Sequence, residues 1–325
     1  MVETIRFISF RIRKKLWDIL KRSGIIKKRP LFDAGEGYGY TFYRKPILNV
    51  QQGNDLIYTL LSSSSPALVA RVGTVEMGVW NNCIAKQYGL TNGLSEKNKQ
   101  TLCNNAGFFP ADSEDDFFLK WAELYGKSIS IADALASFEN HSEDYVFNKY
   151  CPDAKLMQLC SLEPYYFDNP WSKALEHKKV LVIHPFSESI KKQYRLYDKL
   201  FKDKNVLPEF ELLTIKAVQS AAGELTEYES WFEALDSMKE QIDCSDFDIA
   251  ILGCGAYALP LGAYIKEKGK KAIAMAGPTQ LLFGIMGSRW EKNGLMTKFV
   301  NQYWTKPNDS EKPKNAQKVE GACYW

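Results

Sequence analysis

The sequence lacks the marks of several protein classes. Its seven cysteines form no Cys-x-x-Cys pair, so it shows no sign of a cysteine zinc site or of a disulfide framework. No apolar run is long enough to span a bilayer, and no segment has the apolar core and cleavage site of a signal peptide. Internal repeats are missing too. Together these absences predict a protein of the reducing cytoplasm.

What the chain does have is length and apolar content. With 325 residues, of which 45% are hydrophobic, it can bury one large α/β core or two smaller ones. Aromatic residues make up 13% of the chain, which suits a carbohydrate-binding or membrane-surface protein and equally a dense core.

Charge is distributed unevenly along the chain. Residues 1–29 hold ten Arg or Lys against Glu3 and Asp18, a net charge of +8, whereas the whole chain carries +3. The remaining body is therefore mildly acidic, at −5. Nucleic acid is not expected as a partner of this body.

The basic segment 1–29 also has an amphipathic pattern. A helix of this kind binds in the interface of an anionic leaflet, so we predict a peripheral position on the inner face of the membrane. The alternatives are a solvated basic helix and one that packs on the protein's own surface. The apolar residues able to share one helix face are Phe7, Ile8, Ile12, Leu16, Trp17, Ile19 and Leu20.

Residues 30–325 predict one α/β domain, with a subdivision near residue 170 as an alternative. Alternating strand and helix patterns from 179 to 275 are typical of a doubly wound, mostly parallel Rossmann-like sheet. The charged tail after Trp290 is expected to fold back over the body. Strands are predicted at 67–72, 129–132, 156–162, 179–183, 211–215, 247–252 and 271–275.

Helix boundaries follow from capping residues. Asn54 is expected to cap a short helix that ends at Leu61, and Thr74 to cap the helix after the strand 67–72. Gly269 stands where a helix C-terminus takes a left-handed residue. Residues 30–52 are predicted to be irregular. Further helices are predicted within 91–126, on both sides of a turn at 104–110, within 133–150, from 187 to 201, over 227–242 and over 256–268.

Two glycine turns follow neighbouring strands near the end of the chain. Gly253-Cys254-Gly255 comes after 247–252, and the next strand ends at Ala276-Gly277-Pro278-Thr279-Gln280. With the first free helix amides, at Ala256 and Tyr257, these turns form a predicted floor for the phosphates of a nucleotide. The third glycine of the dinucleotide fingerprint is missing, and so is the acidic residue that binds the ribose. Tight strand-to-helix packing is the other explanation for the two glycines of the first turn.

A further candidate ligand-binding segment is Arg71-Val72-Gly73-Thr74-Val75-Glu76, at the end of the strand 67–72. It resembles the Arg-x-Gly-Asp-x-Glu motif of the GT-D-fold glycosyltransferases, and the strand, helix, strand unit 246–290 resembles the closing segment of that family. The stretch 169–290 is also similar to uncharacterised bacterial proteins of surface-polysaccharide type. The resemblance implies an α/β domain that transfers a sugar from a nucleoside-diphosphate sugar, with the motif Asp and Glu holding a divalent cation on the diphosphate.

By this resemblance Arg71 is the motif arginine, Glu76 is the remaining carboxylate, and Thr74 replaces the motif Asp. A hydroxyl with one carboxylate is a weak site for a hard cation. Either Mn²⁺ or Mg²⁺ is held by Glu76 together with the substrate phosphates, or Arg71 and backbone amides such as that of Gly73 neutralise the diphosphate without a metal. Glu76 is alternatively the base for an acceptor hydroxyl, or an ordinary first-turn carboxylate favoured by the helix dipole.

His184 is one of three histidines and follows the clearest strand of the chain, 179–183. Its position at a strand end makes it a candidate base or phosphate ligand, although a histidine before a proline is often structural. Arg195, on the next helix, could reach a phosphate but is equally well explained as a solvated residue. Gln280 and Arg289 are candidates for contacts with a sugar or a base edge.

The leading hypothesis is a membrane-surface glycosyltransferase that acts on a lipid-linked or cell-surface glycan. A second hypothesis is another transferase on the same glycans, of phosphate-ester or pyruvyl type. A third is a non-catalytic membrane adaptor that kept the fold after losing the motif Asp.

Overall fold

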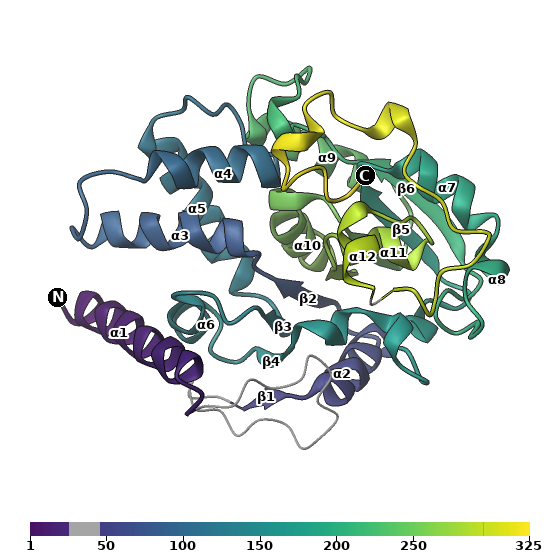
Figure 1. Cartoon of the computed structure of the whole chain (residues 1–325), viewed down its shortest axis with the longest axis horizontal. Coiled ribbons are helices and arrows are strands. Elements are labelled where there is room, and N and C mark those ends of the chain that lie inside the picture. Colours follow the sequence, from purple (N-terminus) through teal and green to yellow (C-terminus); the bar gives the residue numbers. More distant parts are fainter. Residues whose placement is uncertain (26–45, 295) are drawn as a thin grey trace.

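The structure, a computed structural model, describes residues 1–25, 46–294 and 296–325. Its strands form one all-parallel, eight-stranded sheet in the order β1-β4-β3-β2-β8-β7-β5-β6 (Figure 1). The sheet runs without a break across residue 170. The strands are β1 (Ile47–Leu48), β2 (Ala67–Arg71), β3 (Ala134–Ser137), β4 (Lys155–Gln158), β5 (Lys179–His184), β6 (Glu211–Lys216), β7 (Ile249–Leu252) and β8 (Lys271–Ala274).

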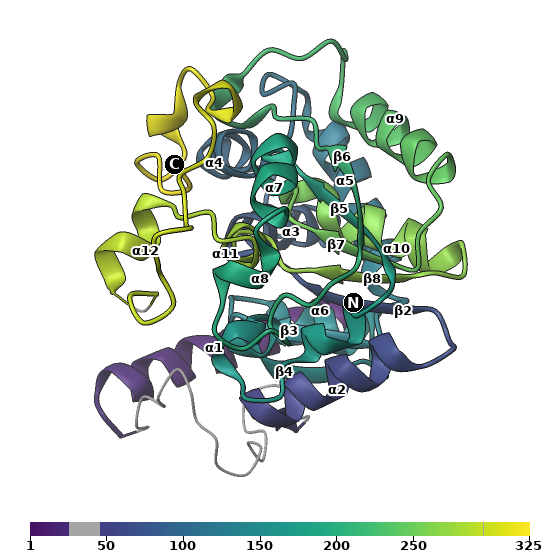
Figure 2. The ribbon, with the colours of Figure 1, turned by 90° about the vertical axis from the view of Figure 1, so that its right-hand side faces the viewer.

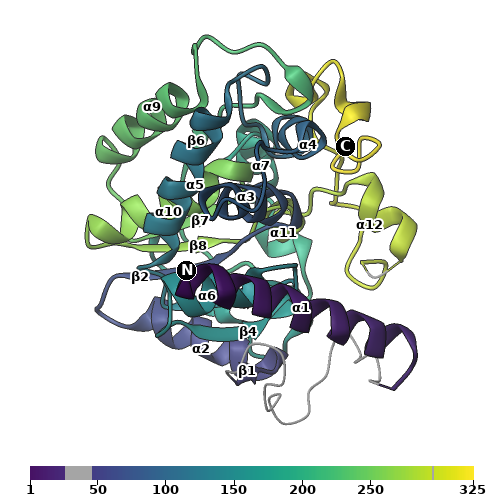
Figure 3. The same ribbon diagram turned by 90° about the vertical axis from the view of Figure 1, so that its left-hand side faces the viewer.

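Helices cover both faces of this sheet. Figure 3 shows the face covered by α3, α5, α9 and α10, and Figure 2 shows the face covered by α2, α7 and α8. The predicted doubly wound, Rossmann-like α/β fold is therefore confirmed. The α-helices are α1 (Val2–Arg22), α2 (Val50–Ser62), α3 (Thr74–Gln87), α4 (Glu96–Ala106), α5 (Asp115–Ile129), α6 (Glu143–Tyr150), α7 (Ser187–Tyr194), α8 (Tyr197–Leu200), α9 (Trp231–Asp243), α10 (Ala258–Glu267), α11 (Pro278–Leu282) and α12 (Ser288–Asn293).

The apolar strands alternate between two cores. In β5, Leu181 and Ile183 belong to the core on the α10 side, whereas Val180 and Val182 belong to the core on the opposite face. Both sets are fully buried. This is why β5 reads in the sequence as an uninterrupted apolar run, as a strand covered on both faces must.

Two predicted strands differ from the structure. The segment 129–132 is not a strand, because the helical spacing of apolar residues such as Tyr125 and Ile129 extends α5 to Ile129. β3 begins only after Asp133, whose carboxylate accepts a hydrogen bond from the Leu68 amide at 2.7 Å. The predicted strand 156–162 ends at Gln158, and a 3₁₀ turn follows because the chain bends toward α2.

Two predicted caps are also wrong. Asn49, not Asn54, caps α2, because its side chain and that of Gln52 each accept a hydrogen bond from the other's backbone amide. Asn54 lies buried within the helix and binds the backbone of residues 169 and 171. Thr74 is the first residue of α3, and its hydroxyl donates to the side chain of Asn140 (2.9 Å).

Other boundaries shift by a few residues. α9 begins at Trp231 rather than at 227, because the side chain of Ser230 caps its first turn. The helix predicted for 187–201 is divided into α7 and α8. Gly269 has the left-handed φ of +79° that its position predicts. Of the predicted irregular stretch 30–52, residues 30–45 lie outside the described part of the chain. For the rest the prediction is wrong, because Ile47–Leu48 form β1 and α2 begins at Val50.

The predicted N-terminal amphipathic helix is present as α1, but its faces differ from the prediction. Phe7 is fully buried and Trp17 is partly buried against the body, whereas Ile8, Ile12, Leu16 and Ile19 are exposed. The reason is that aromatic side chains of other elements supply a docking surface for the rings. No helix in the described ranges is both long and apolar enough to cross a membrane.

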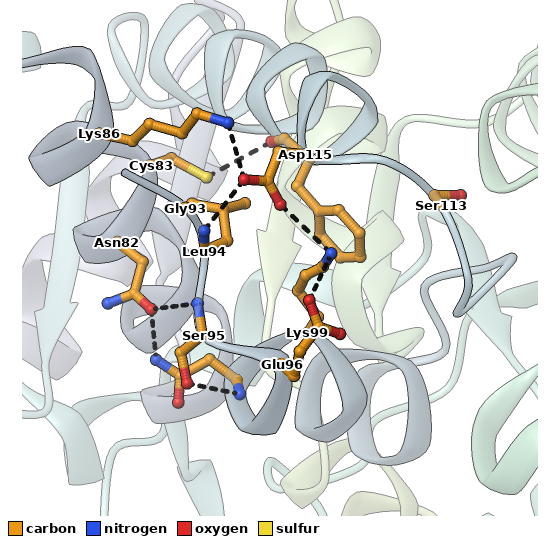
Figure 4. Close-up of polar contacts among 12 residues, drawn as sticks. Asn82, Cys83, Lys86, Gly93, Leu94, Ser95, Glu96, Lys99, Ser113 and Asp115 are labelled. Carbon is orange, nitrogen blue, oxygen red and sulfur yellow. Dashed lines mark hydrogen bonds and ion pairs between the residues drawn. The ribbon is translucent and has the colours of Figure 1, made fainter. Parts of the chain in front are cut away.

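A charged cluster joins α3, α4 and α5 (Figure 4). The Asp115 carboxylate accepts hydrogen bonds from Lys86 (2.7 Å) and from the Leu94 amide (3.0 Å), and it forms an ion pair with Lys99 at 3.2 Å. Burial would raise the pKa of Asp115, but the hydrogen bonds from Lys86 and Leu94 lower it below its ordinary value of 3.8. The cluster thereby fixes α4, whose C-terminal end reaches the edge of the sheet.

Replacing this carboxylate should weaken the fold. We expect Asp115→Asn to lower the free energy of unfolding at neutral pH by about 1–3 kcal/mol, because charge-assisted hydrogen bonds are lost. The loss should shrink as the pH falls from 3.8 through the lower folded pKa of Asp115, where the wild-type carboxylate also becomes protonated. Urea unfolding measures both effects. Asp116→Asn, at the exposed neighbouring position, is the control, and an equal loss there would contradict the assignment.

Candidate functional site

A cavity of ≈ 430 Å³ lies at the carboxyl-terminal edge of the sheet. The segments that follow β2 to β8 all contribute to its lining. This is the edge at which open parallel α/β sheets bind ligands. The lining includes Arg71, Gly73, Thr74, Glu76, Phe138, Glu163, His184, Phe186, Ser220, Gly253, Gly255, Tyr257, Gly277, Gln280, Arg289, Trp290, Tyr324 and Trp325.

The structure brings together nearly all of the predicted site residues. Arg71 and Gly255 line the same cavity although they are far apart in the sequence. Ala256 does not line it, because this residue is fully buried and its carbonyl accepts a hydrogen bond from the Tyr125 hydroxyl (2.7 Å). Arg195 lies exposed at the end of α7 and does not line the cavity.

Arg71 supplies an unpaired positive charge. It ends β2, and its guanidinium lies 5.0 Å from the centre of the Phe138 ring. No residue of the described ranges forms an ion pair with it. Arg289, which also lines the cavity, is already paired with Glu320 and lies 5.0 Å from the Tyr324 ring. Of the two arginines that line the cavity, Arg71 is therefore the one without an ion-pair partner among the described residues, and it can bind an anion.

The first turn of α3 lies beside Arg71. The Glu76 carboxylate folds back over Gly73 so closely that a Cβ atom at residue 73 would lie 2.2 Å from its Oε2 atom. A side chain at residue 73 would therefore have to displace the Glu76 carboxylate, the movable end of a flexible side chain. The Thr74 hydroxyl, in place of the motif Asp, is engaged by Asn140.

These residues do not fit a divalent cation held by protein groups alone. The described ranges contain no group of three or more His, Cys, Asp or Glu side chains placed to hold a metal ion. At the motif itself, Glu76 is the single carboxylate, and a hydroxyl is a poor substitute for the second. A cation would have to take most of its ligands from a bound substrate.

The glycine turns are shaped by close packing. A Cβ atom at Gly253 would lie 2.4 Å from Cδ2 of His184, and one at Gly255 would lie 2.6 Å from the Ala106 carbonyl oxygen. Gly255 also has a left-handed φ of +57°. Tight packing therefore explains why both residues are glycine. The same packing leaves their backbone, rather than side chains, at the cavity surface.

His184 has a defined tautomer. Its Nδ1 atom accepts a hydrogen bond from the Phe186 amide (2.9 Å), so the proton of the neutral ring lies on Nε2. Burial lowers the pKa of His184 to about 3. The ring is therefore neutral at physiological pH. The two predicted roles of His184 are a base and a phosphate ligand. This geometry suits the phosphate ligand better, because Nε2–H can donate to a ligand oxygen.

Glu163 is a cavity residue to which the sequence assigned no role. It lies after the end of β4, just as Arg71 lies at the end of β2. A position after a parallel strand is the sequence feature that could have identified Glu163 as a site residue. Its carboxylate accepts a hydrogen bond from the Tyr165 hydroxyl. Burial raises the pKa of Glu163 to about 7. The group can therefore exchange a proton near neutral pH.

The end of the chain forms one wall of the cavity. The Gln280 side chain donates to the carbonyl oxygens of Ile285 (3.2 Å) and Tyr324 (3.1 Å), so it holds the tail rather than projecting freely. Trp325 packs against Phe186, with ring centres 5.9 Å apart. The expectation that the tail folds back over the body is confirmed, but its place in the cavity wall was not predicted.

Comparisons with known proteins add little. No protein-family model and no curated protein matches the chain. A search of solved structures found a selenomethionine-substituted structure of domain of unknown function 1792 (DUF1792). It is 12% identical, with a TM-score of 0.36, over 74% of this chain and 86% of that chain. A similarity at this level assigns neither a family nor an activity.

Proposed function

We propose that this protein is a glycosyltransferase that moves a sugar from a nucleoside-diphosphate sugar to a hydroxyl of a cell-surface or lipid-linked glycan. The observation that carries the proposal is the meeting of the unpaired Arg71 with the glycine turns after β7 and β8 in one cavity. Transfer from such a donor releases a nucleoside diphosphate. The site must therefore stabilise negative charge that develops on the leaving group.

The cavity residues can divide this task. The Arg71 guanidinium binds the diphosphate, for which its planar, forked donors are well suited. The Nε2–H group of His184 and the backbone amides near Gly255 donate to further phosphate oxygens. The rings of Tyr324 and Trp325 offer apolar surfaces for a base or a sugar. No step in this scheme requires a metal ion held by the protein.

Glu163 is the acceptor base in this proposal. Its carboxylate takes the proton of the acceptor hydroxyl while that oxygen attacks the anomeric carbon of the donor. The bond from this carbon to the diphosphate breaks, and the diphosphate leaves with the electron pair. Glu76, an alternative base predicted from the sequence, would instead order the turn at Gly73 beside Arg71.

A non-catalytic adaptor is the second candidate, because Thr74 replaces the motif Asp and its hydroxyl is engaged by Asn140. An adaptor tolerates the loss of Arg71 and Glu163 in an assay of glycan production, whereas an enzyme does not. Glycan production by the Arg71→Ala and Glu163→Gln variants therefore decides between them.

Donor binding tests the role of Arg71. We expect at least one of the UDP-, GDP- and CMP-sugars to raise the unfolding temperature, and Arg71→Ala to weaken its binding by roughly 10–100-fold, since charge-assisted hydrogen bonds are lost. Thermal shift and calorimetry measure both. Arg195→Ala removes an exposed arginine outside the cavity and should bind as wild type. No stabilisation by any sugar nucleotide would contradict the proposal and would favour a transferase with another donor.

The pH dependence tests the role of Glu163. The ionised form is the base, so the rate should rise as the pH increases through about 7, the pKa to which burial raises Glu163. Glu163→Gln should lower kcat by roughly 10²–10⁴-fold and remove this rise. Release of nucleoside diphosphate is the measurement, with water as acceptor where no glycan is supplied. Glu76→Gln should keep the pH profile, and the reverse pattern would assign the base to Glu76.

A further inference from the structure

Helix α1 exposes a continuous row of large apolar side chains. Single exposed apolar residues are common on protein surfaces, but rows of them mark binding surfaces. The spacing of three or four residues places all members on one side of the helix. This apolar stripe consists of Ile5, Ile8, Ile12, Leu16 and Ile19, which are 61%, 37%, 53%, 55% and 58% exposed.

The opposite side of α1 is attached to the body. Phe7 packs edge-on against Tyr88 and Tyr145, with ring centres 5.8 and 5.0 Å away, and Phe10 packs against Tyr145 at 5.7 Å. Lys21 forms an ion pair with Glu139. The helix is therefore fixed by its buried face, and its apolar stripe must point away from the protein.

Cations border the stripe on both sides. At roughly 100° per residue, Arg11, Lys15 and Arg22 lie along one side of it. Arg6 lies along the other, whereas the guanidinium of Arg13 packs 4.1 Å from the centre of the Phe10 ring. Helix α1 holds seven Arg or Lys against Glu3 and Asp18, which gives it a net charge of +5. An apolar centre bordered by cations is the pattern of a helix that lies in the interface of an anionic bilayer.

We infer that the apolar stripe of α1 is a membrane-binding surface, which inserts between the headgroups of an anionic bilayer while Phe7 and Phe10 keep the helix on the body. A second copy of the chain is a poorer partner. Pairing of two stripes would bring together two helices of net charge +5. Anionic lipids instead neutralise these charges.

The position of α1 relates this surface to the cavity. Its last turns contact the segment after β3: Lys21 binds Glu139, and Asp18 lies 3.7 Å from His141. Phe138 of the same segment lines the cavity. Figure 3 shows α1 beside the lower strands of the sheet. A membrane-bound α1 therefore places the cavity close to the bilayer, and, given the proposed function, the acceptor would be a glycan carried by a lipid.

Flotation of the full chain with vesicles tests the inference. Wild type should float with phosphatidylcholine vesicles that contain phosphatidylglycerol and far less with phosphatidylcholine alone, and added salt should weaken binding. Ile8→Glu/Ile12→Glu should lower the ratio of bound to free protein by at least about tenfold. Leu90→Glu/Leu225→Glu makes the same change at leucines that are 41% and 94% exposed elsewhere, and should float as wild type.

A second variant guards against misfolding of the first. Arg11→Glu/Lys15→Glu leaves the stripe intact and should lose binding to the anionic vesicles. The inference is overturned if wild type and the Ile8/Ile12 variant float equally. It is also overturned if wild type does not float but forms a dimer in analytical ultracentrifugation that this variant abolishes. Flotation needs no sugar nucleotide, so loss of donor binding with normal flotation would refute the proposed function and leave the membrane surface standing.

Discussion

The direction of the strands is the constraint on which the rest of the structure depends. All eight run parallel in one sheet, so every connection must cross back over a face and each strand must end at the same edge. Residues from distant parts of the sequence, such as Arg71, Glu163 and His184, meet at this edge for that reason. The cavity is thus a product of topology.

Burial gives this cavity a particular electrostatic character. It raises the pKa of Glu163 and lowers that of His184, so both shifts favour the uncharged form. Arg289 is neutralised by Glu320. Arg71 has no ion-pair partner in the described ranges, and a guanidinium at a protein surface attracts an anion more strongly than the same charge in bulk water. The Nε2–H group of His184 and the backbone amides of the glycine turns can orient the anion through hydrogen bonds.

Much of the fold and of the candidate site can be predicted from the sequence, but some properties of the site cannot. β5 is visible because a strand buried on both faces must be apolar throughout, and the convergence of Arg71 with Gly255 follows from the rule that ligands bind at strand ends. The tautomer of His184 depends on the Phe186 amide, and the pKa of Glu163 depends on burial by several elements. Such properties belong to the assembled fold, and no local pattern encodes them.

The anchoring of the tail has a consequence for observing the protein. Glu311 accepts hydrogen bonds from the amides of Glu188 and Ser189 at the start of α7, and the Trp325 indole donates to the Glu311 carbonyl oxygen at 3.3 Å. The indole thus lies on the cavity wall within a fixed frame. A molecule that enters would change the polarity around this ring, so its fluorescence offers an intrinsic, label-free signal of occupancy.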